Sequence, residues 1–304
     1  SQTICVGGTI SPGLTATYTG GVGTASYQWQ LTGVNIPGAT SSTYIPPVYT
    51  SPGTNIYKVL ITLSGNGCDV MSSQDATVIV VADPIITTQP ISNTYCQNAS
   101  PIDTLSVVAS GGLGGAYSYQ WYSNSVNSTT GGTLIPGATS SIYIPSATTV
   151  GMVYYYCVVS QSGIDCSVAS SLALITITPG PTFSTQPLNT QTICLGGAVT
   201  ALSVSISSGV GTPSYQWYEN TINSTSGGSP ISGATSISYT PLSITPGTNY
   251  YYCIVTLTGG GCSSITSGVG EVIVLPEPMI ITQPLDSQTI CVGGTISPGL
   301  TATY

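Results

Sequence analysis

The sequence predicts an all-β chain of tandem β-sandwich domains, and three observations support this fold class. Valine, isoleucine and tyrosine occur in short runs typical of strands, while good helix formers are scarce. Glycine, proline, serine, threonine and asparagine separate these runs, as expected of turns and loops. A set of motifs also recurs three times in the 304 residues, which indicates repeated domains.

The repeated motifs place the domain boundaries. Each repeat carries Tyr-Gln-Trp, then Gly-Ala-Thr-Ser, then a strand with tyrosine, and finally a turn with a cysteine. These motifs predict domains at 1–82, 83–178 and 179–276, and a fourth domain that begins at 277–304. The second and third domains open with a segment that ends in Thr-Gln-Pro, and the first domain lacks this first strand.

Residues 1–18 are identical to residues 287–304. Such an identity does not arise by chance, and neighbouring repeats are only similar to one another. We therefore expect the chain to be a segment of a longer periodic polymer whose duplicated unit is a triplet of domains.

Aromatic residues indicate which kind of sandwich each domain forms. The tryptophan of Tyr-Gln-Trp matches the buried tryptophan on the third strand of immunoglobulin-like domains. Tyrosines that follow a turn further along match the tyrosine corner at the start of the sixth strand. We expect these residues to pack in the cores: Trp29, Trp121, Trp217, Tyr57, Tyr155 and Tyr251. The alternative, stacking on a sugar, would require exposed rings.

The cysteine pattern predicts one disulfide inside each domain. Two cysteines, the first and the last, are present in every complete repeat, whereas the sixth-strand cysteine is replaced by Val59 in the first repeat. The predicted pairs are Cys5–Cys68, Cys96–Cys166 and Cys194–Cys262. Each bond should stabilise its domain by roughly 4 kcal/mol. Disulfides imply an oxidising compartment, so we expect an extracellular location.

The competing arrangement is the usual immunoglobulin bridge between the second and sixth strands. It would use Cys157 and Cys253, but the predicted second strands carry no cysteine partner. We therefore expect Cys157 and Cys253 to be unpaired core residues. A zinc site is a weak alternative, because the chain has no histidine and no Cys-x-x-Cys motif.

The charge content excludes several partners. The chain has one lysine, Lys58, no arginine or histidine, and nine acidic residues. Nucleic acids and anionic membrane surfaces require clustered basic residues, so neither is an expected partner. The apolar runs are too short for a membrane-spanning helix, so we expect no direct membrane insertion.

Catalysis is not expected, and neither is a cofactor or metal. Without histidine, the usual base for a serine or cysteine nucleophile is missing. The acidic residues are scattered and do not recur together in the repeats, although a site between domains that uses Asp83 or Glu277 stays open. Acid pairs and calcium sites would require clusters.

The connections between domains are short and contain proline. Proline fixes φ and favours an extended backbone, so these joints should be stiff. We expect an extended rod of domains placed end to end. The joint prolines are Pro84, Pro179, Pro181, Pro276 and Pro278.

The run of Cys-x-Gly-Gly, Tyr-Gln-Trp, Gly-Ala-Thr-Ser, Tyr-Tyr-x-Cys and Gly-Cys resembles the immunoglobulin-like repeats of giant cell-surface adhesins of gliding Bacteroidota. The resemblance covers the whole chain. It implies an adhesive filament exported by type IX secretion, anchored at the outer membrane and moved by the gliding machinery. Its ligand, a surface or a polysaccharide, would bind outside this chain, and neighbouring repeats would be further partners.

Three functions therefore stay open at the level of sequence. The first is the structural repeat region of an adhesive filament. The second is a spacer array in a secreted polysaccharide-degrading enzyme. The third is a set of carbohydrate-binding modules. The complete reading frame would separate the first two, and glycan binding by one triplet would favour the third.

Overall fold

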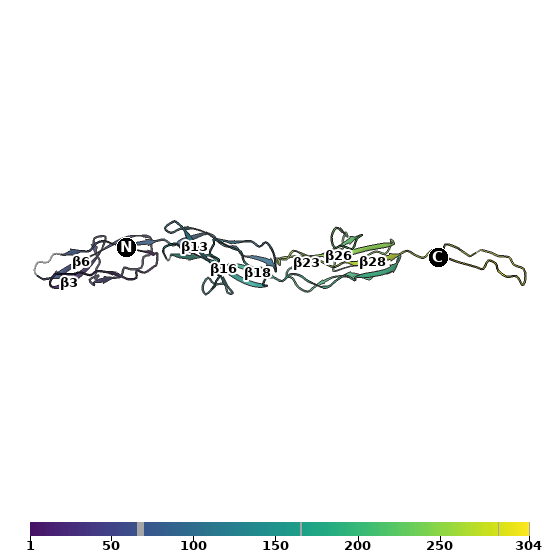
Figure 1. The fold of residues 1–304 in the computed structure, drawn as a ribbon, viewed down its shortest axis with the longest axis horizontal. Helices are drawn as coiled ribbons and strands as arrows, with labels where there is room; N and C mark the ends of the chain where they lie inside the picture. The colour runs from purple at the N-terminus through teal and green to yellow at the C-terminus, as the bar shows by residue number, and fades with distance from the viewer. Residues whose placement is uncertain (66–69, 165, 285, 304) are drawn as a thin grey trace. The chain divides into compact units, whose positions relative to one another are not determined.

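The computed structural model describes residues 1–65, 70–164, 166–284 and 286–303, and the regular elements in these ranges are all strands (Figure 1). The strands fall into three similar sets. No helix in the described ranges is long and apolar enough to cross a membrane. The chain is thus an all-β protein, as the sequence predicts.

The first set has a sheet in the order β1-β8-β6-β3-β4, with β7 beside β6, and a separate pair of β2 and β5. Its strands are β1 (Gln2–Cys5), β2 (Leu14–Thr15), β3 (Thr24–Leu31), β4 (Val34–Asn35), β5 (Thr43–Tyr44), β6 (Gly53–Ser64), β7 (Met71–Ser72) and β8 (Ala76–Val81).

The second set repeats this plan with the sheet β10-β18-β16-β13-β14, with β17 beside β16, and the pair β11–β15. It adds a pair that the first set lacks, β9 with β12. Its strands are β9 (Pro84–Thr88), β10 (Asn93–Cys96), β11 (Leu105–Ser106), β12 (Val108–Gly111), β13 (Tyr117–Asn124), β14 (Thr133–Leu134), β15 (Ile142–Tyr143), β16 (Gly151–Gln161), β17 (Ser167–Ala169) and β18 (Ala173–Thr178).

The third set has the sheet β20-β28-β26-β23-β24, with β27 beside β26, and the pairs β21–β25 and β19–β22. Its strands are β19 (Phe183–Thr185), β20 (Thr190–Cys194), β21 (Leu202–Ser203), β22 (Ser205–Ile206), β23 (Thr212–Asn220), β24 (Ser229–Pro230), β25 (Ser238–Tyr239), β26 (Gly247–Thr258), β27 (Ser264–Thr266) and β28 (Gly270–Leu275).

One parallel pairing sets the geometry of the repeat in the first and third large sheets. β1 pairs with β8 in parallel, and β20 pairs with β28 in parallel, whereas the hairpin strands pair antiparallel. In the first large sheet the order is β8-β6-β3, with the short strand β4 at the edge. This corresponds to the order of the seventh, sixth and third strands in immunoglobulin-like sandwiches. Because the pairing is parallel, β1 and β8 end at the same edge of their sheet, and so do β20 and β28.

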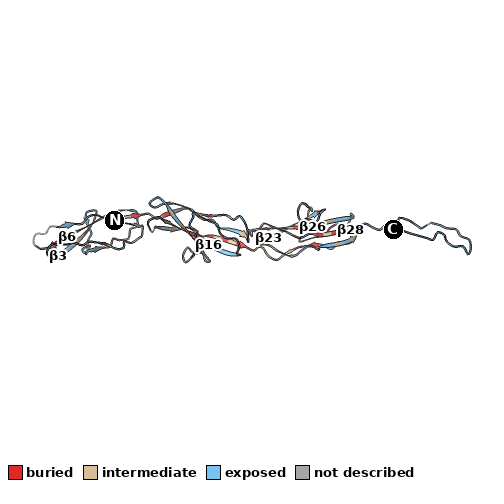
Figure 2. Cartoon of the chain, in the orientation of Figure 1, coloured by how far each residue is buried: buried red, intermediate tan, exposed pale blue. Residues whose placement is uncertain are grey.

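The cores lie along the central strands, where Figure 2 shows the buried residues. β6 alternates as a half-buried strand should, with Tyr57, Val59, Ile61 and Leu63 buried and their neighbours more exposed. In the third set, Leu202, Trp217, Cys253 and Val255 belong to one buried cluster. Period-two burial thus explains the strand pattern of the sequence.

Hydrogen bonds explain why Tyr-Gln-Trp and Gly-Ala-Thr-Ser occur together. The Trp217 backbone N–H donates to the Ala234 oxygen at 3.0 Å, and the indole N–H donates to the Ser236 oxygen at 2.9 Å. Gln216 donates through its side-chain amide to the Ile231 oxygen at 2.8 Å. The two motifs are therefore the two sides of one bonded contact, which the first and second sets repeat.

The described chain divides into two compact units. The first comprises residues 1–94 and 98–177, and the second comprises residues 95–97 and 178–304. Within the second unit, residues 277–303 are mostly exposed and form one isolated bridge, Thr282 with Thr303. The predicted domain boundaries and the rod arrangement stay predictions.

We predict that Trp217→Ala lowers the free energy of unfolding of the third repeat by about 3–5 kcal/mol, because it empties a fully buried site. Ile244→Ala, which truncates a side chain that is 72% exposed, should change it by less than about 0.5 kcal/mol. Urea denaturation followed by near-ultraviolet circular dichroism measures both. Equal stability of the two variants would contradict the core assignment.

Candidate functional site: cross-linked joints between repeats

Two disulfides join residues from consecutive repeats of the sequence. Cys5 is bonded to Cys166, with 5.4 Å between their Cα atoms and a sequence separation of 161 residues. Cys96 is bonded to Cys262, with a Cα distance of 4.6 Å and a separation of 166 residues. Each bond lies inside one of the two compact units. In both cases the first cysteine of one repeat bonds the last cysteine of the following repeat.

The predicted pairing within domains is therefore wrong for Cys5–Cys68, Cys96–Cys166 and Cys194–Cys262. Cys5 and Cys166 bond each other, Cys96 bonds Cys262, Cys194 is a free, exposed thiol, and Cys68 lies outside the described residues. The error was to assume that the two cysteines present in every repeat lie near one another.

The parallel pairing of the first strand explains the correction. It places Cys194 beside Leu275 at the end of β28, whereas Cys262 precedes β27 at the other end of the same sheet. The twelve residues of β26, which pairs with β28 near its start and with β27 near its end, separate these two ends, which is roughly 36 Å at the usual rise of a strand. A disulfide requires Cα atoms within about 7 Å. The cysteines of one repeat therefore cannot reach each other.

The Cys5–Cys166 bond lies where the chain leaves the first set of strands. The Val6 N–H donates to the Val81 oxygen at 2.9 Å, which holds Cys5 at the end of β8. Asp83 follows directly, and its carboxylate lies within 4.8 Å of both sulfurs. Pro84 is buried and begins β9. The bond thus joins the turn before β17 to the end of β1, next to the segment that connects the two repeats.

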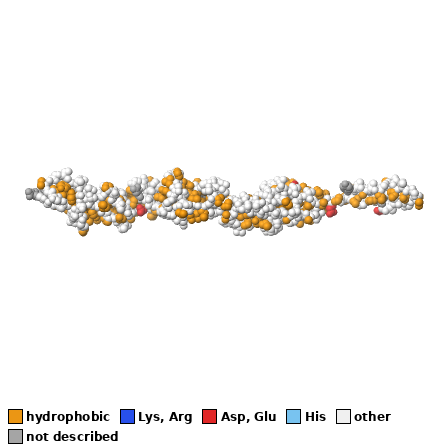
Figure 3. Space-filling view, turned by 90° about the horizontal axis from the view of Figure 1, so that it is seen from below, with side chains coloured by type: hydrophobic (Ala, Val, Ile, Leu, Met, Phe, Trp, Pro, Cys, Tyr) orange, Lys and Arg blue, Asp and Glu red, His pale blue; other side chains and the backbone are white. Residues whose placement is uncertain are grey.

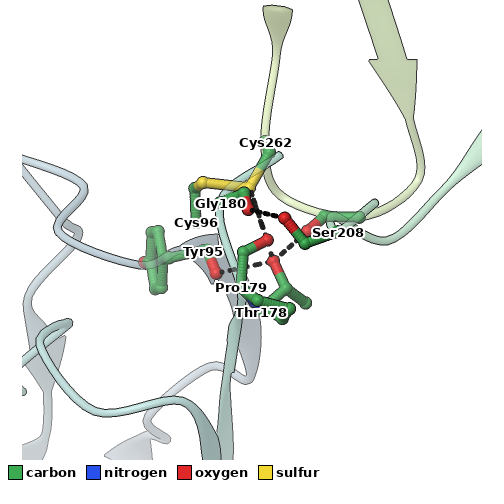
Figure 4. The surroundings of a disulfide bond; sticks show 8 residues. Tyr95, Cys96, Thr178, Pro179, Gly180, Ser208 and Cys262 are labelled. Atoms are coloured by element: carbon green, nitrogen blue, oxygen red, sulfur yellow. Dashed lines mark hydrogen bonds between the residues drawn. A yellow bond between two sulfur atoms is a disulfide. The ribbon is translucent and has the colours of Figure 1, made fainter. Parts of the chain in front are cut away.

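The Cys96–Cys262 bond has the same surroundings in the second unit (Figure 4). Thr178 is buried, and its hydroxyl contacts the carbonyl oxygens of Tyr95 at 3.2 Å and of Gly260. The Cys262 sulfur lies 3.5 Å from the Pro179 oxygen. Thr178, at the end of β18, therefore connects β10, which carries Cys96, to the turn that carries Cys262.

Glycine and serine shape this joint. A Cβ on Gly260 would lie 1.7 Å from the Val210 oxygen, so the turn before Cys262 leaves no space for a side chain there. Ser208 donates its hydroxyl to the Gly180 oxygen at 2.8 Å, which fixes the connecting segment from its other side (Figure 4). Close packing of two loops thus requires glycine at position 260, while Gly259 and Gly261 have positive φ angles of 89° and 78°.

The remaining predicted cysteines occupy two different environments. Cys157 and Cys253 are fully buried thiols at equivalent positions of β16 and β26, opposite Trp121 and Trp217. Burial raises the pKa of each thiol to about 11, although backbone hydrogen bonding from Gln120 or Gln216 opposes the shift. Both therefore stay protonated and unreactive near neutral pH. Cys291, like Cys194, is exposed and free.

The predicted core aromatics are buried. Trp29 is 3% exposed, Trp121 and Trp217 are fully buried, and the tyrosines Tyr57, Tyr155 and Tyr251 are at most 8% exposed. Their rings therefore offer no open face to a sugar. The hydroxyl of Tyr57 forms a hydrogen bond with that of Tyr49, and the hydroxyl of Tyr251 donates one to the Glu219 carboxylate. In a tyrosine corner the hydroxyl would instead form a hydrogen bond with the backbone.

The predicted joint prolines differ in burial. Pro84 is buried, Pro179 and Pro181 are half-buried, and Pro276 and Pro278 are exposed. The first three lie beside a disulfide or the loop that carries it. Pro276 directly precedes the exposed segment 277–303, and Pro278 lies within it.

Charged groups are sparse on the face that Figure 3 shows. Lys58 forms a surface ion pair with Asp75, with 3.2 Å between nitrogen and oxygen. Among the described residues, the one group of three metal-ligand side chains is Cys5, Asp83 and Cys166. Its sulfurs are joined to each other and so offer no thiolate to a metal. Glu277 is exposed, and Asp69 and Asp165 lie outside the described residues.

Sequence reasoning missed the residues that complete the joint, above all Thr178 and Ser208. The signal for them was weak, because serine and threonine are abundant throughout the chain. The glycine-rich turn before each last cysteine was the stronger signal. It marks a place where backbone approaches backbone.

Comparison with protein-family models gives a match over part of the chain. A family model described as Domain of unknown function (DUF8696) matches residues 185–276. Comparison with curated proteins gave no match.

Several solved structures of tandem domains are similar to the chain. Titin domains I67–I69 in an E-to-A mutated variant have 16% identity and a TM-score of 0.48, covering 90% of this chain and 95% of that one. Extracellular domains 3–5 of Drosophila OTK have 14% identity and a TM-score of 0.41, covering 91% and 94%. Three N-terminal domains of the outer capsid protein Hoc of bacteriophage RB49 have 13% identity and a TM-score of 0.44, covering 83% and 88%. None of these similarities extends to a ligand or an activity of this chain.

Cleavage at methionine distinguishes the two pairings. Met71, Met152 and Met279 are the methionines of the chain, so cyanogen bromide separates residues 1–71, 72–152, 153–279 and 280–304. Without reduction, the bonds described here should keep the first three fragments in one piece. Release of fragment 1–71 before reduction would show that Cys5 is bonded to Cys68 instead.

Alkylation should separate the two kinds of free thiol. At pH 8 in the folded protein, iodoacetamide should modify the exposed Cys194 and Cys291 and leave Cys157 and Cys253 unmodified, because burial keeps their pKa at about 11. Peptide mass spectrometry reads each site. In urea all four should react, and fast modification of Cys157 in the folded chain would contradict the assignment.

Proposed function

We propose that this chain is part of the structural repeat region of a long extracellular filament and catalyses no reaction itself. The observation that carries the proposal is the pair of disulfides, each of which bonds the first cysteine of one repeat to the last cysteine of the next. Consecutive repeats are then joined covalently by the backbone and also by a disulfide. A chain that must transmit tension benefits from this arrangement more than an enzyme or a ligand carrier does.

The composition supports the same function. Disulfides persist in oxidising compartments, which places the protein outside the cytoplasm. Proline in the connecting segments restricts their backbone. Few charges mean weak electrostatic self-repulsion and little dependence on salt. These properties suit an extracellular filament that must keep its structure when the salt concentration around the cell changes.

The finer part of the proposal is an adhesin, exported by type IX secretion, anchored at the outer membrane and used in gliding. It is supported by the repeated motifs, which resemble those of giant Bacteroidota adhesins. The ligand, a surface or a polysaccharide, would then bind outside this chain. The gliding and secretion machinery would be a further partner of the complete protein.

Antibodies raised against the chain test the proposal on the cells that produce it. Immunogold electron microscopy should label threads on the cell surface, and Fab fragments should reduce attachment of the cells to glass or polysaccharide. Label confined to the cell interior would contradict the filament. Purification of the native protein with polysaccharide-degrading activity in the same polypeptide would favour the spacer array of an enzyme.

A further inference from the structure

The two cross-linked joints share one backbone framework. We call the surroundings of the disulfide in the first compact unit the first joint, and those of the disulfide in the second unit the second joint. At the first joint the Val6 N–H donates to the Val81 oxygen at 2.9 Å, and at the second the Gln97 N–H donates to the Thr178 oxygen at 2.8 Å. Val81 and Thr178 therefore occupy equivalent positions, and the joints can be compared residue by residue.

The sulfurs are buried to the same pattern in both joints. Cys5 and Cys96 are half-buried, whereas Cys166 and Cys262 are at most 5% exposed. In thiol–disulfide exchange a thiolate attacks one sulfur while the other leaves as a thiolate. A thiol in solution can therefore attack Cys5 or Cys96, and the buried cysteine becomes the leaving group. Burial alone predicts similar rates for the two bonds.

A carboxylate distinguishes the first joint from the second. Asp83 lies two residues after Val81, and its carboxylate lies within 4.8 Å of both sulfurs. The equivalent residue, two after Thr178, is Gly180, which brings no charge. Negative charge spreads over the three sulfurs while a thiolate attacks, so a carboxylate at this distance raises the barrier to exchange at the first joint.

A hydroxyl distinguishes the second joint in the opposite direction. The Thr178 hydroxyl oxygen lies 3.7 Å from the Cys262 sulfur, within hydrogen-bond reach of the leaving thiolate (Figure 4). Once Cys262 is protonated, its S–H can donate to the Pro179 oxygen, 3.5 Å from the sulfur. Val81 has no hydroxyl to offer Cys166. Because a hydrogen bond stabilises a thiolate and makes it a better leaving group, the second joint should exchange faster.

We propose that the second joint is a thiol-reducible cross-link, whereas Asp83 protects the first joint from thiol reductants. A thiolate attacks the Cys96 sulfur, the bond between the sulfurs breaks, and Cys262 leaves as a thiolate that takes a proton from water. A second thiol then attacks the mixed disulfide, which releases Cys96 as a thiol and the reductant as its own disulfide. The protein gains two electrons and two protons, which two thiol molecules supply.

Selective reduction changes one connection and leaves the other. Opening the second joint releases the turn that carries Cys262 from β10, while the loop closed by Cys5 and Cys166 stays intact. The chain then has one permanently cross-linked connection and one that responds to the thiol concentration around it. This inference concerns the reactivity of the two bonds, so it does not depend on the proposed filament.

The experiment measures both reduction rates in the same molecule. Free thiols of the folded full chain are first blocked with unlabelled iodoacetamide, which prevents exchange within the chain. Dithiothreitol at mildly alkaline pH then reduces the chain, an excess of isotopically labelled iodoacetamide quenches each sample, and peptide mass spectrometry follows the label on Cys5 and Cys96. Cys96 should be labelled about tenfold faster. Sodium chloride at about 0.5 M should narrow this ratio, because salt screens the exposed Asp83 carboxylate.

Three single substitutions test the two causes separately. Asp83→Asn keeps the shape of the side chain and removes its charge, so labelling of Cys5 should become about fivefold faster. Gly180→Asp should slow reduction of the second joint, since a Cβ there would lie 3.9 Å from the Cys96 sulfur, an ordinary contact. Thr178→Val removes the hydroxyl at nearly constant volume and should slow the second joint by about threefold.

The joint that a substitution does not touch is the control within each variant. It should keep its natural rate, whereas unfolding would accelerate both joints. Equal rates at the two joints of the natural chain, faster labelling of Cys5 than of Cys96, or an unchanged rate of Cys5 labelling in Asp83→Asn would overturn the proposal. Each of these results would leave the proposed filament unaffected.

Discussion

The parallel pairing of β1 with β8 and of β20 with β28 is the constraint on which the other features depend. Because β1 ends beside the end of β8, and β20 beside the end of β28, the first cysteine of a repeat always lies where the chain leaves that repeat. The last cysteine lies in the turn at the opposite end. The two cysteines of one repeat are then too far apart to form a disulfide. The first cysteine instead bonds the last cysteine of the following repeat. The register of one strand pair therefore decides how consecutive repeats are cross-linked.

Much of the fold could be predicted from the sequence, since its signals are local. Alternating apolar residues in β6 and the repeated Tyr-Gln-Trp motif identify the strands and the buried tryptophans without any knowledge of distant contacts. The partner of Cys5 is a different kind of problem. It depends on which end of the sheet each cysteine occupies, and spacing along the chain carries no such information. Thr178 was hidden for a related reason, because its two backbone partners come from different loops.

The substitution at position 59 shows what the buried thiols contribute. Val59 in β6 stands where Cys157 and Cys253 stand in β16 and β26, and all three are fully buried opposite a tryptophan. A valine can replace the thiol because the site requires only a small apolar side chain. The cysteines that matter for the architecture are instead those at the two ends of each repeat. The cysteines at the two ends thus recur in all three repeats, whereas the buried thiol does not.

The overlap of the two disulfide-closed loops has a further consequence for the durability of the chain. One loop runs from residue 5 to residue 166 and the other from residue 96 to residue 262, so every peptide bond between residues 5 and 262 lies inside at least one loop. Hydrolysis of any one of them by an environmental protease leaves the two sides joined through sulfur. Separate loops within each repeat would leave unprotected stretches between them. A molecule exposed outside the cell, where no damaged segment can be resynthesised in place, would thereby survive a single backbone break in one piece.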